Sequence, residues 1–151
     1  MNLEDLTFKV KNITDSSNKL SGMREEVGIE TYRLIASFNG KEEIGRVTFE
    51  RMVELKDSQY KSDEFFYDTS CKPHKPRPFL FFMGVEEGYK GNNVAGLMVR
   101  KVNDYCKDEF GLPLYSGTCN RDSAKRVWEK LVDEGVAFEC EYDGKRRWGL
   151  K

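Results

Sequence analysis

The segment from Phe79 to Met98 constrains the fold of this chain more than any other part of the sequence. It begins with a nearly continuous apolar run over 79–85, passes through a turn rich in glycine and asparagine, and ends with apolar residues at helical spacing. Such a run predicts a buried strand. A strand that leads through small residues into a helix directs several backbone N–H groups to one point, where the helix N-terminus adds partial positive charge. We therefore expect this turn to hold a phosphate or pyrophosphate group.

Two amphipathic helices follow this turn. The first is expected over 93–110 and ends at Gly111 and Pro113. Residues 112–119 alternate like a strand, with Leu114 and Ser116 on one face and Tyr115 on the other. A second helix begins at a cap provided by Asn120 or Asp122 and ends at Gly135. Its apolar face consists of Ala124, Val127, Trp128, Leu131 and Val132.

The remaining elements are strands and hairpins. A first strand is expected over 6–10, a hairpin over 32–49 turns at Asn39-Gly40, and a final hairpin over 136–150 turns at Asp143-Gly144. A short helix over 19–27 and a helical turn over 55–62 are the expectations for the polar connections. The strand–helix–strand unit requires a parallel pair, whereas the hairpins are antiparallel. We therefore predict one domain over 1–151, of mixed α/β (α+β) class, with helices packed on a central mixed sheet of six to seven strands.

Composition excludes several classes of protein. The 151 residues include 25 Lys plus Arg and 26 Asp plus Glu, so the strongly basic footprint of a nucleic-acid-binding protein is absent. No apolar run approaches the roughly 20 residues of a membrane span, and no signal peptide is visible at the start. The four cysteines are single and predict reduced thiols in a cytoplasmic protein: Cys71, Cys106, Cys119 and Cys140.

The order of elements and two motifs resemble the GNAT superfamily of acetyl-CoA-dependent N-acetyltransferases. The family turn has Arg or Gln, two variable residues, Gly, one variable residue, and Gly or Ala; the residues here are Lys90, Gly91, Asn92, Asn93, Val94 and Ala95. The second motif is the helix of 120–135, in which residues 123–131 resemble the family's penultimate helix. The element order resembles the family over 32–150, and the likeness is sharp only in these two segments.

The chain departs from the family pattern at three positions. Lys90 replaces Arg or Gln and supplies a point charge instead of a planar fork. Asn93 replaces Gly, and asparagine is the residue best able to keep a left-handed backbone there. Trp128 stands where many members have a tyrosine that protonates the departing thiolate, which an indole cannot do. The pair of helices that usually follows the first strand is also reduced.

The resemblance implies acetyl-CoA as acyl donor. Amides from Gly91 to Gly96 would hold the pyrophosphate, and pantetheine would lie between the strand ending at Val85 and residues 114–116. A backbone N–H near Gly84 or Val85 would polarise the thioester carbonyl. The residues expected to contact the donor are Met83, Gly84, Val85, Lys90, Gly91, Asn92, Asn93, Val94, Ala95, Gly96, Asn120 and Trp128.

Other interpretations of single residues stay open. Trp128 suits the core as well as the cofactor cleft, and Asn120 suits a helix cap as well as a cofactor contact. Ser116 is the candidate catalytic residue, because its hydroxyl could relay a proton, although it is also an ordinary strand residue. His74 and Cys71 form a Cys-x-x-His pair without a second pair, so no metal is expected.

The expected function is transfer of an acetyl group from acetyl-CoA to an amine by direct attack in a ternary complex. The alternative is a degenerate GNAT-like module that binds a partner and catalyses nothing, which the departures at Asn93 and Trp128 motivate. The expected partners are acetyl-CoA and an amine acceptor that is a small molecule or a protein. The sequence leaves the oligomeric state open, and an exchanged or paired final hairpin is one way to build a homodimer. Neither a membrane nor a nucleic acid is expected. The sequence does not indicate the acceptor, the general base or the role of the 52–78 connection.

Overall fold

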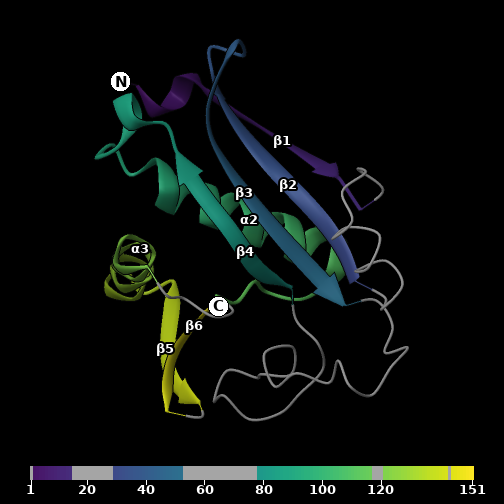
Figure 1. The fold of residues 1–151 in the computed structure, drawn as a ribbon, viewed down its shortest axis with the longest axis vertical. Helices are drawn as coiled ribbons and strands as arrows, with labels where there is room; N and C mark the ends of the chain where they lie inside the picture. The colour runs from purple at the N-terminus through teal and green to yellow at the C-terminus, as the bar shows by residue number, and fades with distance from the viewer. Residues whose placement is uncertain (1, 15–28, 53–77, 117–120, 143) are drawn as a thin grey trace.

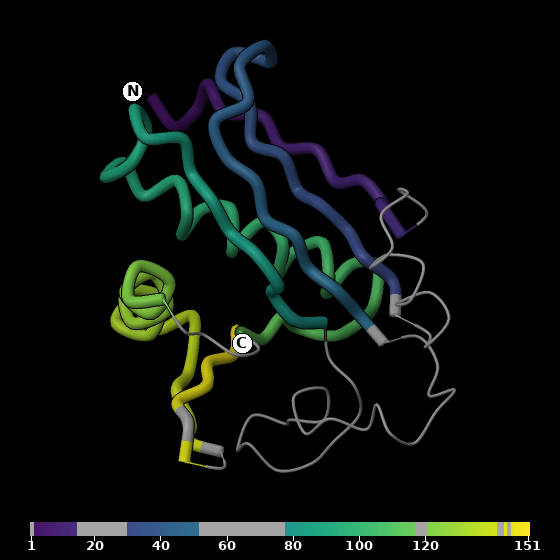
Figure 2. Tube along the Cα trace, in the orientation of Figure 1, coloured from purple at the N-terminus to yellow at the C-terminus, as the bar shows by residue number. Residues whose placement is uncertain are grey.

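The computed structural model describes residues 2–14, 29–52, 78–116, 121–142 and 144–151 (Figures 1 and 2). The expected helix over 19–27, the helical turn over 55–62, and the residues Cys71, His74, Cys119 and Asn120 all lie outside the described residues. None of the helices in the described ranges is long and apolar enough to cross a membrane.

Four antiparallel strands form the larger sheet, in the order β1-β2-β3-β4. They are β1 (Leu6–Asn12), β2 (Ile29–Phe38), β3 (Glu42–Met52) and β4 (Phe79–Val85), preceded by the short 3-10 helix η1 (Leu3–Asp5). The β2–β3 hairpin turns at Asn39 and Gly40, whose φ angles of 53° and 70° are left-handed. The first three strands are those expected from the alternating patterns, β4 is the one expected from the apolar run, and the Asn-Gly turn is confirmed.

Helix α2 (Val94–Phe110) lies behind this sheet in Figure 1 and covers one of its faces. Gly45 on β3 permits the close approach: a Cβ there would lie 3.0 Å from Sδ and Cε of Met98 on α2. Side chains alternate along a strand, so Val47 and Phe49 share the α2 face with Gly45 and are fully buried. Arg46, Thr48 and Glu50 therefore point to the opposite face, which we call the far face. Helix α2 ends as expected at Gly111, which has a φ of 69°.

The C-terminal part consists of helix α3 (Asp122–Asp133) and the hairpin of β5 (Ala137–Tyr142) and β6 (Lys145–Leu150). Trp128 and Leu131 of α3 are buried in the core, as the helical spacing predicted. The N-terminal residue before α3 is Arg121, without a side-chain cap, so the expectation that Asp122 caps the helix is wrong. Asp122 instead lies in the first turn, where its carboxylate favours the positive end of the helix dipole.

The two sheets are joined by residues 114–116, which corrects the expectation of one continuous sheet. Among the described residues of 112–119, only Tyr115 pairs, through a parallel bridge to Phe79 and an antiparallel bridge to Gly149. Four backbone bonds make this junction: Leu80 N–H to Tyr115 O (2.9 Å), Tyr115 N–H to Pro78 O (3.0 Å), Ser116 N–H to Trp148 O (2.8 Å) and Leu150 N–H to Leu114 O (2.9 Å). The parallel sense of the strand–helix–strand unit is confirmed. The strand β4 and the C-terminal hairpin diverge from this junction (Figure 1).

The expectation of four reduced thiols is wrong. Cys140 on β5 is disulfide-bonded. Cys106 on α2 is a free thiol that is fully buried in the core, and this burial raises its pKa. Cysteines that are scattered singly give no local signal for such a bond.

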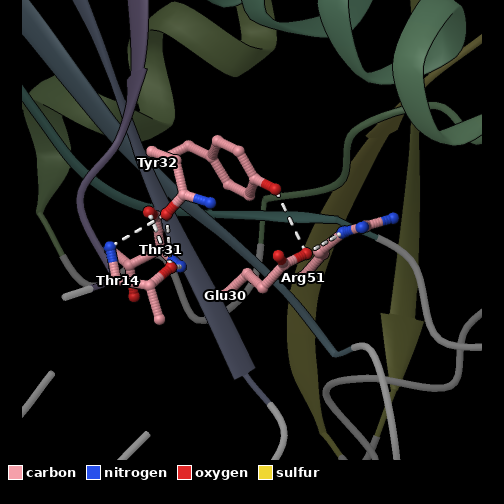
Figure 3. A network of polar contacts seen from close by, with 6 residues as sticks. Thr14, Glu30, Thr31, Tyr32 and Arg51 are labelled. Carbon is pink, nitrogen blue, oxygen red and sulfur yellow. Dashed lines mark hydrogen bonds and ion pairs between the residues drawn. The ribbon is translucent and has the colours of Figure 1, made fainter. Parts of the chain in front are cut away.

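A side-chain contact on the α2 face joins Glu30 of β2 to Arg51 of β3. Glu30 Oε1 accepts from Tyr32 Oη (3.1 Å) and from Arg51 Nε (2.6 Å), as Figure 3 shows. The Arg51 guanidinium also lies over the Phe110 ring at 4.1 Å. Burial, followed by the nearby Glu30 carboxylate, raises the pKa of Tyr32 to about 12.

We expect a loss of stability at high pH that depends on Tyr32. Between about pH 10 and pH 12 the unfolded chain loses the phenolic proton while the folded chain keeps it, so the free energy of unfolding falls as pH rises, by at most about 1.4 kcal/mol per pH unit from this group. Denaturant titrations of wild type and Tyr32→Phe across this range measure the difference. Equal slopes in the two proteins would contradict the prediction.

A second expectation concerns Gly149 on β6. The Phe138 ring of β5 lies directly over Gly149, and an added Cβ would collide with the ring, with Cε1 at 2.8 Å. Gly149→Ala should therefore lower the free energy of unfolding by about 1–3 kcal/mol, as overpacking does in a close-packed region. Gly88→Ala is the matched control, because a Cβ at Gly88 meets nothing within 4 Å. Equal stability of the two variants in urea denaturation would contradict this account.

Candidate functional site

The turn between β4 and α2 has the left-handed geometry that the sequence predicted. After the 3-10 helix η4 (Glu87–Tyr89), Gly91 has a φ of 86° and Asn93, which precedes α2, has a φ of 62° and a ψ of 23°. Asn93 thus keeps the conformation for which glycine is usual. Its Oδ1 lies only 2.7 Å from the position of a Cβ on Gly96, so Gly96 leaves the space that the Asn93 side chain uses.

The backbone N–H groups of this turn are available to a ligand. Within the described part of the chain, no N–H from Gly91 to Gly96 donates to a protein acceptor, and the first helical bond runs from Leu97 N–H to Asn93 O at 3.1 Å. The Asn93 side chain makes no capping bond. Residues 91–93 are exposed to solvent. An anion at this point would therefore meet unpaired donors and the positive end of a 17-residue helix.

Contacts around Tyr89 hold the turn in place. Its hydroxyl donates to Glu42 Oε2 at 2.8 Å, which raises the Tyr89 pKa, and its ring meets Phe38 at 6.2 Å between centroids. Asn92 Nδ2 donates to the Tyr89 carbonyl at 3.2 Å, so the Asn92 side chain belongs to the turn itself. Lys90 forms an exposed ion pair with Glu87 (2.8 Å), which lowers the pKa of that carboxyl. Such an exposed pair contributes little to stability and leaves Lys90 able to turn toward an anion.

The edge of β4 that points away from β3, which we call the open edge, carries a second set of N–H donors. Glu86 N–H donates to Ile44 O on β3 at 2.8 Å. N–H directions alternate along a strand, so the Gly84 N–H also faces β3, whereas those of Val85 and Met83 face away from it. Of the two N–H groups expected to polarise a carbonyl, Val85 is therefore directed to the open edge and Gly84 is not.

A β-bulge at Phe81 explains the direction of these donors. Phe49 of β3 is opposite Leu80 and Thr48 is opposite Phe82, which leaves Phe81 as an extra residue. The Leu80 N–H points away from β3, toward Tyr115. Because Phe81 is an extra residue, the alternation shifts by one, and beyond the bulge it is the N–H groups of odd-numbered residues that point away from β3. The sequence suggested a bulge or a close approach at Gly84. The bulge lies at Phe81, and Gly84 makes the close approach, since its carbonyl lies 3.1 Å from the position of a Cβ on Gly45.

Ser116 is buried beside the point where the two sheets diverge. It is 2% exposed, and its Oγ accepts a bond from the Trp148 N–H at 3.0 Å. This bond ties residues 114–116 to β6 and gives Ser116 a structural task. The catalytic role expected for Ser116 stays a prediction.

Trp128 is 1% exposed and belongs to the core cluster around α2 and α3. Its burial agrees with the core interpretation, and a contact with a cofactor stays a prediction. Asn120, the other expected contact near this helix, lies outside the described residues.

Sequence reasoning did not single out three residues near the junction. Phe81 and Phe82 of β4 are 50% and 43% exposed, although the apolar run predicted a strand buried on both faces. Glu50 of β3 is 0% exposed, although it is acidic. The sequence signal for the position of Glu50 was its spacing of two residues from Thr48, which puts both on one face of an alternating strand. The structure shows that Thr48 is opposite Phe82 on that face.

Comparison with known proteins identifies the fold. No protein-family model and no curated protein matches the sequence. Among solved structures, AtaTR bound with AcCoA shares 11% identity over 98% of this chain and 94% of that one, with a TM-score of 0.53. A mutant AtaT toxin bound to the C-terminus of the antitoxin AtaR and acetyl-CoA shares 11% identity over 95% of this chain and 92% of that one, with a TM-score of 0.56. Spermidine N-acetyltransferase from Vibrio cholerae shares 13% identity over 97% of this chain and 94% of that one, with a TM-score of 0.53. This chain therefore has the fold of the GNAT superfamily of acetyltransferases.

Proposed function

We propose that this protein transfers an acetyl group from acetyl-CoA to an amine. The observation that carries the proposal is the row of unpaired N–H groups from Gly91 to Gly96, placed between the open edge of β4 and the N-terminus of α2. Two of the similar structures, AtaTR and the AtaT toxin complex, contain acetyl-CoA, and a third is a spermidine N-acetyltransferase. The fold is therefore one in which this chemistry occurs.

The described residues fit the donor at both ends. The amides of residues 91–96 and the Lys90 ammonium would hold the pyrophosphate. The Met83 and Val85 N–H groups face the edge along which pantetheine would lie, as an added strand does. Acetyl-CoA supplies an acetyl group activated as a thioester. Trp128, and Asn120 outside the described residues, remain proposed contacts of the donor.

The chain's own groups would act mainly by positioning and by polarisation. The Val85 or Met83 N–H would donate to the thioester carbonyl oxygen and stabilise the charge that develops there. Holding the amine against that carbonyl removes much of the entropic barrier. The α2 face of β4 is filled by core side chains, including Met98 and Val47, so the amine must reach the carbonyl from the far face.

We expect acetyl-CoA to raise the melting temperature. A ligand at 100 times its Kd stabilises the folded state by about 2.7 kcal/mol, which corresponds to several degrees for a chain of this size. Lys90→Ala should weaken binding several-fold without changing stability, because its ion pair with Glu87 is exposed. Lys107→Ala, at the other end of α2, is the matched control and should bind as wild type does. Differential scanning fluorimetry across an acetyl-CoA titration measures all three.

Thiol release from acetyl-CoA then tests transfer, with spermidine, an aminoglycoside and a peptide N-terminus as acceptors. No melting shift at millimolar acetyl-CoA would reject the donor site. A normal shift without thiol release for any acceptor would favour a protein that only binds acetyl-CoA.

Ser116→Ala separates the two roles of Ser116. Loss of Oγ leaves the buried Trp148 N–H without its acceptor, so we expect the free energy of unfolding to fall by about 1–3 kcal/mol. A proton relay through Ser116 would in addition lower kcat at a temperature where both proteins are fully folded. Wild-type kcat in a destabilised variant would reject the relay and leave the structural role.

A further inference from the structure

Unpaired cations gather on the far face of the sheet, which is turned toward the viewer in Figure 1. They are Lys9 and Lys11 of β1 and Arg33 of β2, which we call the far-face cations. Within the described part of the chain, their side chains form no hydrogen bond and no ion pair. This is also the face from which the amine must reach the carbonyl, so these charges bear on which acceptor can approach.

The strand register places two of the cations in one row across the sheet. Lys11 is opposite Arg33, and Arg33 is opposite Thr48 of β3. Thr48 is in turn opposite Phe82 of β4. Residues directly opposite each other share a face, and Thr48 points to the far face, so the whole row does. Lys9, two residues before Lys11, points to the same side. The row thus runs from β1 to the strand whose open edge is proposed to hold the donor.

This placement is unfavourable in the free protein. Like charges directly opposite on antiparallel strands repel, so Lys11 and Arg33 oppose the pairing of β1 with β2. In addition, the Nε of Arg33 is buried and has no acceptor among the described residues. A buried donor without a partner is costly. An anion held between the two side chains would relieve the repulsion and supply the missing acceptor.

The acids of the described strands on this face do not supply that anion. Glu43 pairs with Arg46 at 2.6 Å near the β2–β3 turn. Glu50 is fully buried in the next row, where its Oε2 accepts from Thr31 Oγ1 at 3.0 Å. Neither carboxylate forms an ion pair with a far-face cation. The positive charge of Lys9, Lys11 and Arg33 is therefore available to a ligand.

Exposed aromatic rings lie between these cations and the open edge. Phe82 is 43% exposed, and its ring lies beside Gly84, since a Cβ on Gly84 would be 3.3 Å from Cε1 and Cζ of the ring. Phe81, the extra residue of the bulge, is 50% exposed. An apolar side chain that covered these rings would remove apolar surface from water. The face thus offers apolar contact beside the carbonyl site and positive charge further across.

The spacing of the strands sets the length of a suitable acceptor. Neighbouring strands lie about 4.8 Å apart, so β2 is roughly 10 Å and β1 roughly 14 Å from β4. An extended peptide advances about 3.3 Å per residue. A peptide with its amine at the open edge of β4 would therefore bring its third to fifth residues over Arg33 and Lys11 when it crosses the far face.

We propose that the far face binds an acidic peptide and presents its amine to acetyl-CoA, an inference that deepens and rests on the proposed transferase function. Arg33 and Lys11 hold carboxylates three to five residues from the amine, and Phe82 contacts an apolar side chain between them. The amine nitrogen forms the C–N bond to the acetyl carbon, the C–S bond breaks, and the proton lost by the amine balances the one taken up by the thiolate. The products are the amide and the free thiol.

A nucleic acid fits this face less well than an acidic peptide. Three unpaired cations in a chain of net charge −1 are few for a polyanion, whose binding depends on many neutralised phosphates. One or two carboxylates with an apolar neighbour match the number of cations and the exposed rings.

The central test compares three lysine-free peptides that have a free N-terminus and differ only at the third to fifth positions. These positions carry glutamates, glutamines or arginines. We expect kcat/KM to be about 10–100-fold higher for the acidic peptide than for the neutral one, the size of one charge-assisted contact. The difference should lie mainly in KM, because the contact is remote from the reacting atoms, and it should shrink as salt is added.

Reversal of one charge assigns the preference to the row. Lys11→Glu changes an exposed residue and places a carboxylate opposite Arg33, so that it neutralises both cations. The acidic peptide should lose about 10–100-fold in kcat/KM, while the neutral peptide and the acetyl-CoA melting shift stay as in wild type. Arg33→Gln should act in the same direction, and the exposed Lys11 keeps the test decisive if that variant is unstable. Lys101→Glu, an equal charge change on α2, is the matched control and should keep the wild-type preference.

A binding measurement separates docking from transfer. The anisotropy of the acidic peptide, labelled at its C-terminus, reports its Kd without any reaction. This Kd should rise about 10–100-fold in Lys11→Glu and stay unchanged in Lys101→Glu. An otherwise identical acidic peptide with a blocked N-terminus and a single lysine shows which kind of peptide amine is acetylated.

The outcomes separate the two proposals. Equal kcat/KM for the acidic and neutral peptides, or an equal loss for both in Lys11→Glu, would overturn the acidic-peptide site alone. Faster transfer to an amine on an oligonucleotide than to any peptide would overturn it as well. Binding of the acidic peptide that Lys11→Glu weakens, without transfer to any amine, would overturn the transferase and leave the docking surface. Absence of an acetyl-CoA melting shift in wild type would overturn the donor site.

Discussion

The backbone pairing of Tyr115 is the contact on which the rest of this structure depends. Its N–H and carbonyl bond to the start of β4, while its neighbours Leu114 and Ser116 bond to β6. Among the described residues, the four-stranded sheet and the C-terminal hairpin thus meet along a single row, and the two sheets diverge from it (Figure 1). Strands paired along their full length would leave no unpaired edge on β4. Among the described residues only this row joins the two sheets, and the N–H groups of Met83 and Val85 face the edge of β4 at the place where the donor is proposed to lie.

Much of this arrangement was predictable because local sequence determines it. The apolar run of β4, the helical spacing of α2 and the Asn-Gly turn each specify an element through nearby residues, and all three were found. The left-handed Asn93 was also predictable, since few side chains other than asparagine adopt that backbone. Local signals therefore located the turn and the helix that define one end of the candidate site.

The features that were missed depend on contacts between distant segments. No local pattern shows that β3 is one residue out of step with β4, so the bulge at Phe81 and the resulting N–H directions could not be read from the sequence. The same holds for the burial of Glu50, which follows from its register opposite Phe79, and for the disulfide of Cys140. Residues 112–119 alternate as a strand should, but how far a strand pairs is decided by its neighbours and not by its own residues.

The bulge at Phe81 has a consequence for how this strand can change in evolution. One added residue decides whether odd-numbered or even-numbered amides line the open edge of β4. A deletion between Leu80 and Phe82 that kept the pairing of β4 with Tyr115 would turn the Gly84 amide outward and the Val85 amide inward. The length of this strand, more than the identity of its side chains, therefore determines which peptide group can meet a carbonyl oxygen, and relatives should tolerate substitutions here more readily than gaps.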